Sequence, residues 1–230
     1  MKRLALLGIG CYLLALLIAF PPALALRWLA PKDLSMQSPA GSVWRGETQA
    51  ASYAGYYLGS TKWSMQPLAL LRGRLAYEIE AQAPDGFIKG VFAVTPTGKL
   101  HVSKLSAVAS IQTLAPLLPP EVPAGLVKGR AQLKLEELQL ADGWPLAARG
   151  QVDLVDLEVM SGDPLGSYEI QLDGDDGVHG TFHDTGGTVE IKGTLTLNAD
   201  RSSDLQCTAH PRPNASDMVK SAVGSLCRGS

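Results

Sequence analysis

The feature that most restricts the fold of this chain is an alternation of apolar and polar residues that begins near residue 41. In the segment 74–80, for example, Leu75, Tyr77 and Ile79 alternate with charged or small residues. Successive side chains of a β-strand point to opposite faces, so this period gives each strand one apolar face and one polar face. Antiparallel sheets show this pattern, whereas the strands of buried parallel sheets are apolar on both faces.

The alternation recurs along the chain, and turn-forming residues separate the alternating segments. These segments are 74–80, 88–94, 100–102, 131–140, 152–159, 168–172 and 189–197. The turn formers are Pro84-Asp85-Gly86, Thr97-Gly98, Asp142-Gly143, the segment 173–177 and Gly186-Gly187. No long helical pattern alternates with the strands, which argues against βαβ units. We therefore predict a mostly β fold, a curled antiparallel sheet or a β-sandwich-like domain with a few short helices.

Two of the predicted strands change phase internally. After Glu136-Glu137 the apolar positions shift by one residue, and the same happens at Val155-Asp156. One extra residue would move every later side chain to the other face, so we predict a β-bulge or a sharp bend at each place. Long strands that bend indicate a sheet that curls over its own apolar face.

Three short helices are predicted between or after the strands. The segment 66–71 carries Pro67 near a first helical position, and 110–115 is stopped by a proline. The segment 216–226 has the most regular apolar stripe of the three, and Asn214 precedes it as a candidate capping residue.

The first residues of the chain predict contact with a membrane. After Lys2 and Arg3, residues 4–26 form 23 uncharged positions, closed by Arg27. A helix of this length crosses the roughly 30 Å hydrocarbon core of a bilayer. The basic pair places the N-terminus in the cytoplasm under the positive-inside rule. We therefore predict a cytoplasmic stub at 1–3, a transmembrane anchor helix at 4–26 and one periplasmic β-rich domain at 27–230.

A cleaved signal peptide is the alternative for the same segment. Residues 23–25 form an Ala-Leu-Ala cleavage pattern, and the basic pair would then be the n-region. The unbroken apolar part, residues 4–20, has 17 positions and exceeds the usual h-region of about 7–15, which favours the retained anchor. Both alternatives export the remaining chain. In an oxidising periplasm we expect Cys207, which follows the last predicted strand, and Cys227, which ends the last predicted helix, to form a disulfide that ties this helix down.

Composition and motifs argue against several classes of function. Twenty Lys and Arg against 22 Asp and Glu, with no basic run, offer no footprint for nucleic acid. No catalytic or nucleotide-binding motif is present, so we expect no enzyme activity and no cofactor. His179 and His183 lie about 13 Å apart on a strand, too far for one metal ion, and the segment 173–177 departs from the calcium-loop pattern. We therefore expect no metal site.

A set of glycines, tryptophans and one proline in the first part of the exported chain has a recognisable spacing. The set comprises Gly41, Trp44, Gly46, Gly59, Trp63 and Pro67, followed by Leu70-Leu71-Arg72-Gly73. In this spacing the chain resembles the type II secretion system protein N family, also called general secretion pathway protein N. The resemblance extends over nearly the whole chain, and residues 41–73 carry its specific motifs. We interpret the two tryptophans as rings that cover a sheet face, so the set marks the fold rather than a site.

The resemblance implies a single-pass inner-membrane protein with most of its chain in the periplasm. It would be an accessory part of the machine that exports folded proteins across the outer membrane, with other secretion subunits as partners. The alternative is a protein similar to the AsmA-like proteins, which are linked to lipid transport between envelope membranes. A curled sheet with one continuous apolar face fits both, and an apolar strip left open would need a lipid or a protein partner.

Overall fold

A computed structural model of the chain describes residues 34–53, 55–114, 127–159, 164–215, 217 and 220. The predicted anchor helix at 4–26, and most of the predicted helix at 216–226, lie outside these residues. Within the described part of the chain, none of the helices is both long and apolar enough to cross a membrane.

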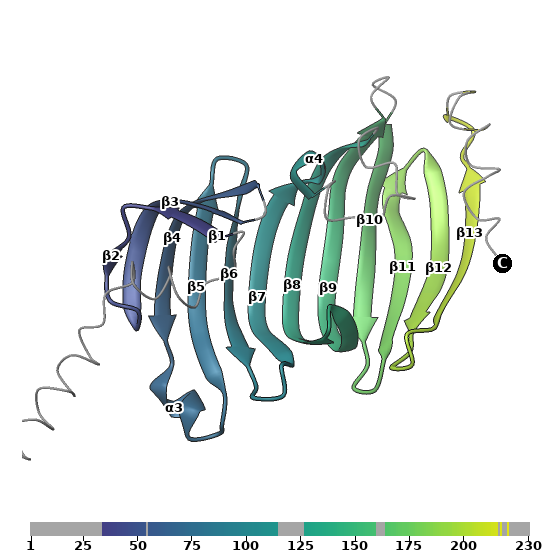
Figure 1. Cartoon of the computed structure of the whole chain (residues 1–230). Helices are drawn as coiled ribbons and strands as arrows, with labels where there is room; N and C mark the ends of the chain where they lie inside the picture. The colour runs from purple at the N-terminus through teal and green to yellow at the C-terminus, as the bar shows by residue number, and fades with distance from the viewer. Residues whose placement is uncertain are drawn as a thin grey trace, which may run out of the picture.

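In the described residues, thirteen strands form one antiparallel sheet in which consecutive strands from β2 onward are hydrogen-bonded neighbours (Figure 1). The strands are β1 (Leu34–Gln37), β2 (Ala40–Gly41), β3 (Arg45–Tyr53), β4 (Tyr56–Met65), β5 (Leu75–Ala83), β6 (Gly86–Val94), β7 (Leu100–Ser110), β8 (Val127–Ala141), β9 (Trp144–Val159), β10 (Pro164–Asp173), β11 (Val178–Gly187), β12 (Val189–Leu197) and β13 (Ser203–Pro211). β1 and β2 both pair with the outer side of β3, so they share one edge, and β13 forms the other.

The prediction of a mostly β, antiparallel fold is confirmed, and the curled sheet is the form it takes. Each predicted strand coincides with an observed one to within one residue. The predicted turns separate the strands, except that Gly186-Gly187 forms the end of β11. No second sheet occurs among the described residues, so the sandwich-like form of the prediction is wrong for this part of the chain. The predicted helices at 66–71 and 110–115 appear as α3 (Pro67–Leu70) and α4 (Ile111–Leu114), which lie at opposite ends of the strands (Figure 1).

Both predicted irregularities are present as shifts in strand register. Between β8 and β9 the register shifts between Leu135 and Glu137, so that Leu135 pairs with Gly150 and Leu138 with Ala148. The extra residue returns Leu138 to the face that Leu135 occupies, which keeps the apolar face continuous through the bulge. At the second place Asp156 has a φ of +52°, and the pairing of β9 with both of its neighbours is interrupted there.

The most tightly packed part of the sheet lies near α4, over β9 to β12. Ile111 of α4 packs with Leu157 and Tyr168, and partly buried side chains surround this group. Val189 and Ala215 form a second small cluster beside it. Elsewhere the buried apolar residues are mainly alanines. The core is therefore concentrated at one end of the later strands instead of extending under the whole sheet.

A buried ion pair fastens the segment after β13 to the sheet. Arg212 Nη2 donates to Asp184 Oδ2 over 2.7 Å, and Arg212 Nη1 donates to the Gly187 carbonyl over 2.9 Å. The side chain of Asp184 is only 5% exposed. Burial raises the pKa of the nearby Tyr168 hydroxyl, and the Asp184 charge adds to this effect. Because the carboxylate is enclosed, its charge depends on the guanidinium for compensation.

The structure describes one of the two cysteines of the predicted disulfide. Cys207 lies on β13 and is disulfide-bonded. Cys227 lies outside the described residues, so the Cys207–Cys227 pairing stays a prediction.

We predict that Arg212→Met will lower the free energy of unfolding by about 2 kcal/mol, because it leaves Asp184 buried without its cation. This figure lies below the loss for a fully buried pair because the Arg212 side chain is partly exposed. Urea unfolding of the full chain in detergent measures the change. Arg201→Met is the matched control, since Arg201 pairs with an Asp142 that is 87% exposed and should lose less than about 0.5 kcal/mol. Equal losses in the two variants would contradict the assignment.

Candidate functional site

The residues of the predicted motif meet at the corner of the sheet formed by β2, β3 and β4. The indole N–H of Trp63 donates to the Ser42 carbonyl over 3.1 Å. Its ring lies against Gly46, where any Cβ would come within 3.0 Å of the ring and of the Ala40 carbonyl. Gly41 pairs with Gly46 and has a φ of +96°, which a glycine adopts without strain. The two glycines thus make room for the tryptophan.

The other three motif residues support the same corner from the backbone. Gly59 has a φ of +74° and lies where the register of β3 and β4 is irregular. The carbonyl of Trp44, in the turn before β3, accepts a hydrogen bond from the Met65 amide over 2.6 Å. Pro67 opens α3, where its missing N–H costs nothing. These contacts are consistent with the interpretation of the motif as a mark of the fold.

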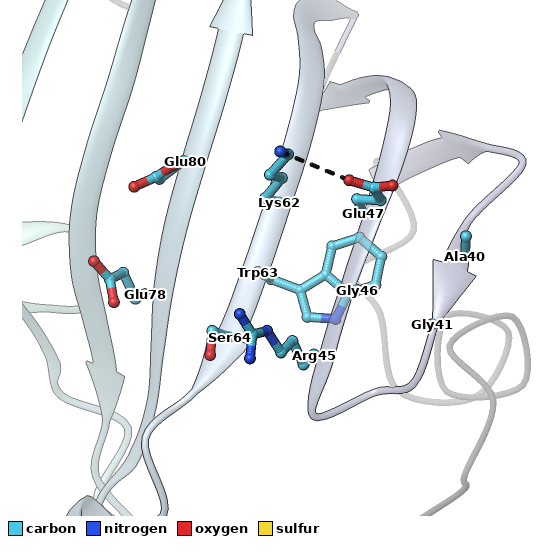
Figure 2. A pocket seen from close by; sticks show the side chains of 10 residues that line it. All are labelled: Ala40, Gly41, Arg45, Gly46, Glu47, Lys62, Trp63, Ser64, Glu78 and Glu80. Atoms are coloured by element: carbon cyan, nitrogen blue, oxygen red, sulfur yellow. Dashed lines mark ion pairs between the residues drawn. The ribbon is translucent and has the colours of Figure 1, made fainter.

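A polar pocket of about 490 Å³ lies at this corner, with Trp63 among its lining residues, and is drawn in Figure 2. Lys62 Nζ and Glu47 Oε2 lie 3.8 Å apart across β3 and β4. Glu78 and Glu80 on β5 both lie near Lys89, whose ammonium lowers the pKa of the Glu80 carboxyl. The charges are mixed and exposed, so the pocket offers no poised acid or base.

Sequence reasoning did not find this pocket. The alternation along β5 does place Glu78 and Glu80 on one face. Their position beside Lys62 and Lys89, however, follows from the register of β5 with β4 and β6. One sequence contains no signal for that register.

The histidines and aspartates considered as metal ligands do not converge. No group of three or more His, Cys, Asp or Glu side chains is placed to hold a metal ion anywhere in the described residues. His183 pairs with Lys192 on one face of β11, while the next residue, Asp184, points to the other face and binds Arg212. In the β10–β11 turn the carboxylate of Asp175 accepts a hydrogen bond from Arg149 over 2.8 Å.

The largest candidate surface is the apolar face of the sheet itself. The registers align apolar side chains in rows that cross many strands. One row contains Tyr77, Phe92, Val102, Leu138 and Ala148, from β5 to β9. Another contains Leu105, Leu135, Gly150, Leu172, Gly180, Leu195 and Leu205, from β7 to β13.

The opposite face is polar along the same strands. Lys62, Glu80, Lys89 and Ser106 form one of its rows, from β4 to β7. The two faces therefore differ sharply in chemistry, although they belong to one layer of backbone.

Little of the described chain covers the apolar face. α3 and α4 have four residues each, and neither lies along the sheet (Figure 1). Val189 is the largest side chain that is less than 2% exposed in the described residues. An apolar hollow of about 280 Å³ lies at the end of β4 to β7 opposite α3, lined by Tyr57, Ala81, Phe87 and Val108 among others. Most side chains in the two rows are partly buried, and Leu205 at the β13 edge is exposed.

Comparisons with known proteins place this fold in bacterial type II secretion. A family model described as type II secretion system (T2SS), protein N, matches residues 32–228. The type II secretion system protein N of Aeromonas hydrophila is 25% identical, over 97% of this chain and 91% of the relative. No solved structure matched the chain. The chain belongs to the type II secretion system protein N family, which confirms the resemblance found in residues 41–73.

We predict that Gly46→Ala will cost about 2 kcal/mol of stability, because the new methyl group overlaps the Trp63 ring and a backbone carbonyl that cannot move away easily. Gly180→Ala is the matched control. It also lies on the apolar face of a strand, but its Cβ would come no nearer than 3.3 Å, to the end of the Leu172 side chain. Urea unfolding compares the two variants, and a control that loses as much as Gly46→Ala would contradict the assignment.

Proposed function

We propose that this protein is an inner-membrane accessory component of the type II secretion system, and that it supports export of folded proteins through protein contacts without catalysis. The single observation that carries the proposal is the family match over residues 32–228. The sequence adds the uncharged segment 4–26, which would anchor the chain. The structure adds a large sheet with an apolar face and two edges, which are surfaces suited to protein contacts.

The proposed topology is bitopic, with a short cytoplasmic stub and a periplasmic sheet. An anchor confines the sheet to a layer near the inner membrane, which raises its effective concentration for other anchored subunits. Weak contacts then suffice for association, since the second contact is made within the same layer.

The free edges of the sheet supply one means of contact. The Arg212 amide donates to the Thr188 carbonyl and the Asn198 amide to the Ser202 carbonyl, which shows that the even-numbered residues of β13 bond to β12. The odd-numbered residues, such as Leu205 and Ala209, therefore direct their backbone N–H and C=O groups outward. An outward ladder of this kind can accept a strand from a partner.

A second candidate function is the binding of lipid, and the open apolar face is the observation that favours it. The rows of apolar side chains and the hollow near Tyr57 would fit acyl chains. The family match speaks for the secretion role, so we keep lipid binding as the alternative.

We predict that deleting the gene from a strain with a working secretion system will reduce the extracellular amount of a secreted enzyme, with folded enzyme accumulating in the periplasm. The wild-type chain should restore secretion, whereas a chain with residues 1–26 replaced by a cleavable signal should restore it poorly, since the effective concentration is lost. Enzyme activity in medium and periplasm measures both effects.

Two further results of that experiment would count against the proposal. Full secretion in the deletion strain would remove the accessory role for that system. Normal secretion together with altered outer-membrane lipid composition would assign the protein to lipid handling instead.

The topology gives a separate prediction. A reporter that is active only in the periplasm, fused after Ser230, should be active, and the fusion should stay in membranes after an alkaline wash. A soluble product with a new N-terminus at Leu26 would show that the segment 4–26 is a cleaved signal.

A further inference from the structure

The exposed large apolar side chains of the described residues gather at the end of the strands that carries α3. Nine such residues are exposed, and five of them lie here. We call this group the α3 tip, which consists of Leu68, Leu70, Leu71, Leu75 and Val94. Leu71 is 84% exposed and Leu68 is 75% exposed. Leu75 and Val94 are paired on neighbouring strands, so they continue the patch onto the apolar face of the sheet.

The exposure of these leucines is built into an ordered turn. The Gly73 amide donates to the Leu70 carbonyl over 2.9 Å, and the Arg74 amide donates to the Ala69 carbonyl over 3.0 Å. These two bonds, with Gly73 at a φ of +67°, form the Schellman arrangement that ends a helix. The Gln66 amide donates to the Ala76 carbonyl on β5 and ties the start of the turn to the sheet. The backbone is satisfied, yet no residue of α3 is buried.

Positive charges flank the α3 tip. Arg72 and Arg74 lie in the same turn and are exposed, as is Lys99 in the neighbouring β6–β7 turn. The segments 66–77 and 94–101, which contain the β4–β5 and β6–β7 connections, have no Asp or Glu, whereas the more distant turns at this end of the sheet carry aspartates, namely Asp142, Asp173, Asp175, Asp176 and Asp200. Desolvation lowers the pKa of His101, and the positive charges of Arg74 and Lys99 lower it further, against an opposing effect of Glu137. Arg74 and Lys99 are therefore close enough to act on the same ring.

We propose that the α3 tip inserts its leucines into the surface of an anionic phospholipid bilayer, with Arg72, Arg74 and Lys99 contacting the headgroups. Apolar side chains flanked by basic residues are the composition that favours the membrane interface. The charge complementarity selects an anionic lipid surface over a second copy of this chain, because two such tips would bring like charges together. The inference rests on the proposed location at the inner membrane, where a lipid surface lies within reach of an anchored domain.

Docking at this tip would give the sheet a fixed orientation. α3 lies at one end of the strands (Figure 1). Insertion of this end would orient β4 to β6 with their α3 ends at the membrane surface and the hollow near Tyr57 at the end farther from it. An anchor alone leaves a domain free to tumble, whereas a second contact limits that freedom. The edges of the sheet would then project at a defined height above the bilayer.

The test uses the full chain with Cys11→Ala, reconstituted in lipid vesicles, with an environment-sensitive dye on an introduced cysteine. Leu71→Cys places the dye on the α3 tip. Tyr53→Cys is the matched control, because Tyr53 is exposed, lies outside the lining of the hollow and pairs with Tyr56 at the far end of β4, about 30 Å along that strand from the end that leads to α3. The Cys11→Ala chain with no added cysteine gives the labelling blank. Quenching by nitroxide-labelled lipid is measured in vesicles of phosphatidylcholine with phosphatidylglycerol and in vesicles of phosphatidylcholine alone.

We expect lipid quenching of the dye at position 71 but not at position 53, and only with phosphatidylglycerol present. Arg72→Gln and Arg74→Gln should each weaken the quenching on the order of fivefold, as expected for one basic residue near an anionic surface. Lys134→Gln and Lys192→Gln, on the polar face, should leave it unchanged.

Three results would overturn the proposal. They are equal quenching at positions 71 and 53, quenching that does not depend on phosphatidylglycerol, and shielding of position 71 in native envelope membranes but not in lipid vesicles. The last result would assign the tip to a protein partner. The assay contains no secretion machinery, so its failure would leave the proposed role in secretion standing, and a failure of that role would leave the lipid contact standing.

Discussion

The structure depends on the hydrogen-bond ladder between neighbouring antiparallel strands, because a single layer has no second sheet to hold it in place. Each strand is held mainly by the strands before and after it in the sequence. Cross-strand side-chain pairs contribute roughly 0.2–1 kcal/mol each, so stability accumulates along many such pairs instead of in one core. This explains why the described core is small and rich in alanine, with its larger side chains gathered near α4.

A sheet of this length needs local features of two kinds: some that bend the long strands and some that hold the outermost segments in place. The bulges at Glu136 and Asp156 bend the long strands β8 and β9 while keeping their leucines on one face. At the first edge, Gly41 and Gly46 let the Trp63 ring lie close to the backbone, which fastens β2 to β3 and β4. At the other end, the pair of Asp184 and Arg212 fastens the chain that leaves β13.

The same architecture explains how such a protein could act without a catalytic centre. Its distinctive surfaces are an apolar face, two strand edges and a tip where leucines and arginines lie together, and each is a surface for contact. The polar face carries ion pairs such as Arg149 with Asp175, which are exposed and contribute little to stability. These pairs keep that face hydrated. Membership in the type II secretion system protein N family places these contacts in the setting of protein export.

The local pattern of residues by itself determined seven of the strands, most of their turns, the bulges, two of the short helices and the family, because alternation, turn formers and motif spacing act over a few residues. Only the tertiary structure decided that one sheet forms without a sandwich partner, because that depends on which strands pair and in what register. The strand register likewise placed Glu78 and Glu80 beside Lys62. It also set the partners of His183 and Asp184, whose side chains lie on opposite faces of the sheet. The exposure of Leu71 could not be predicted from the sequence either, since an apolar residue in a turn is buried or exposed depending on which other segments pack against it.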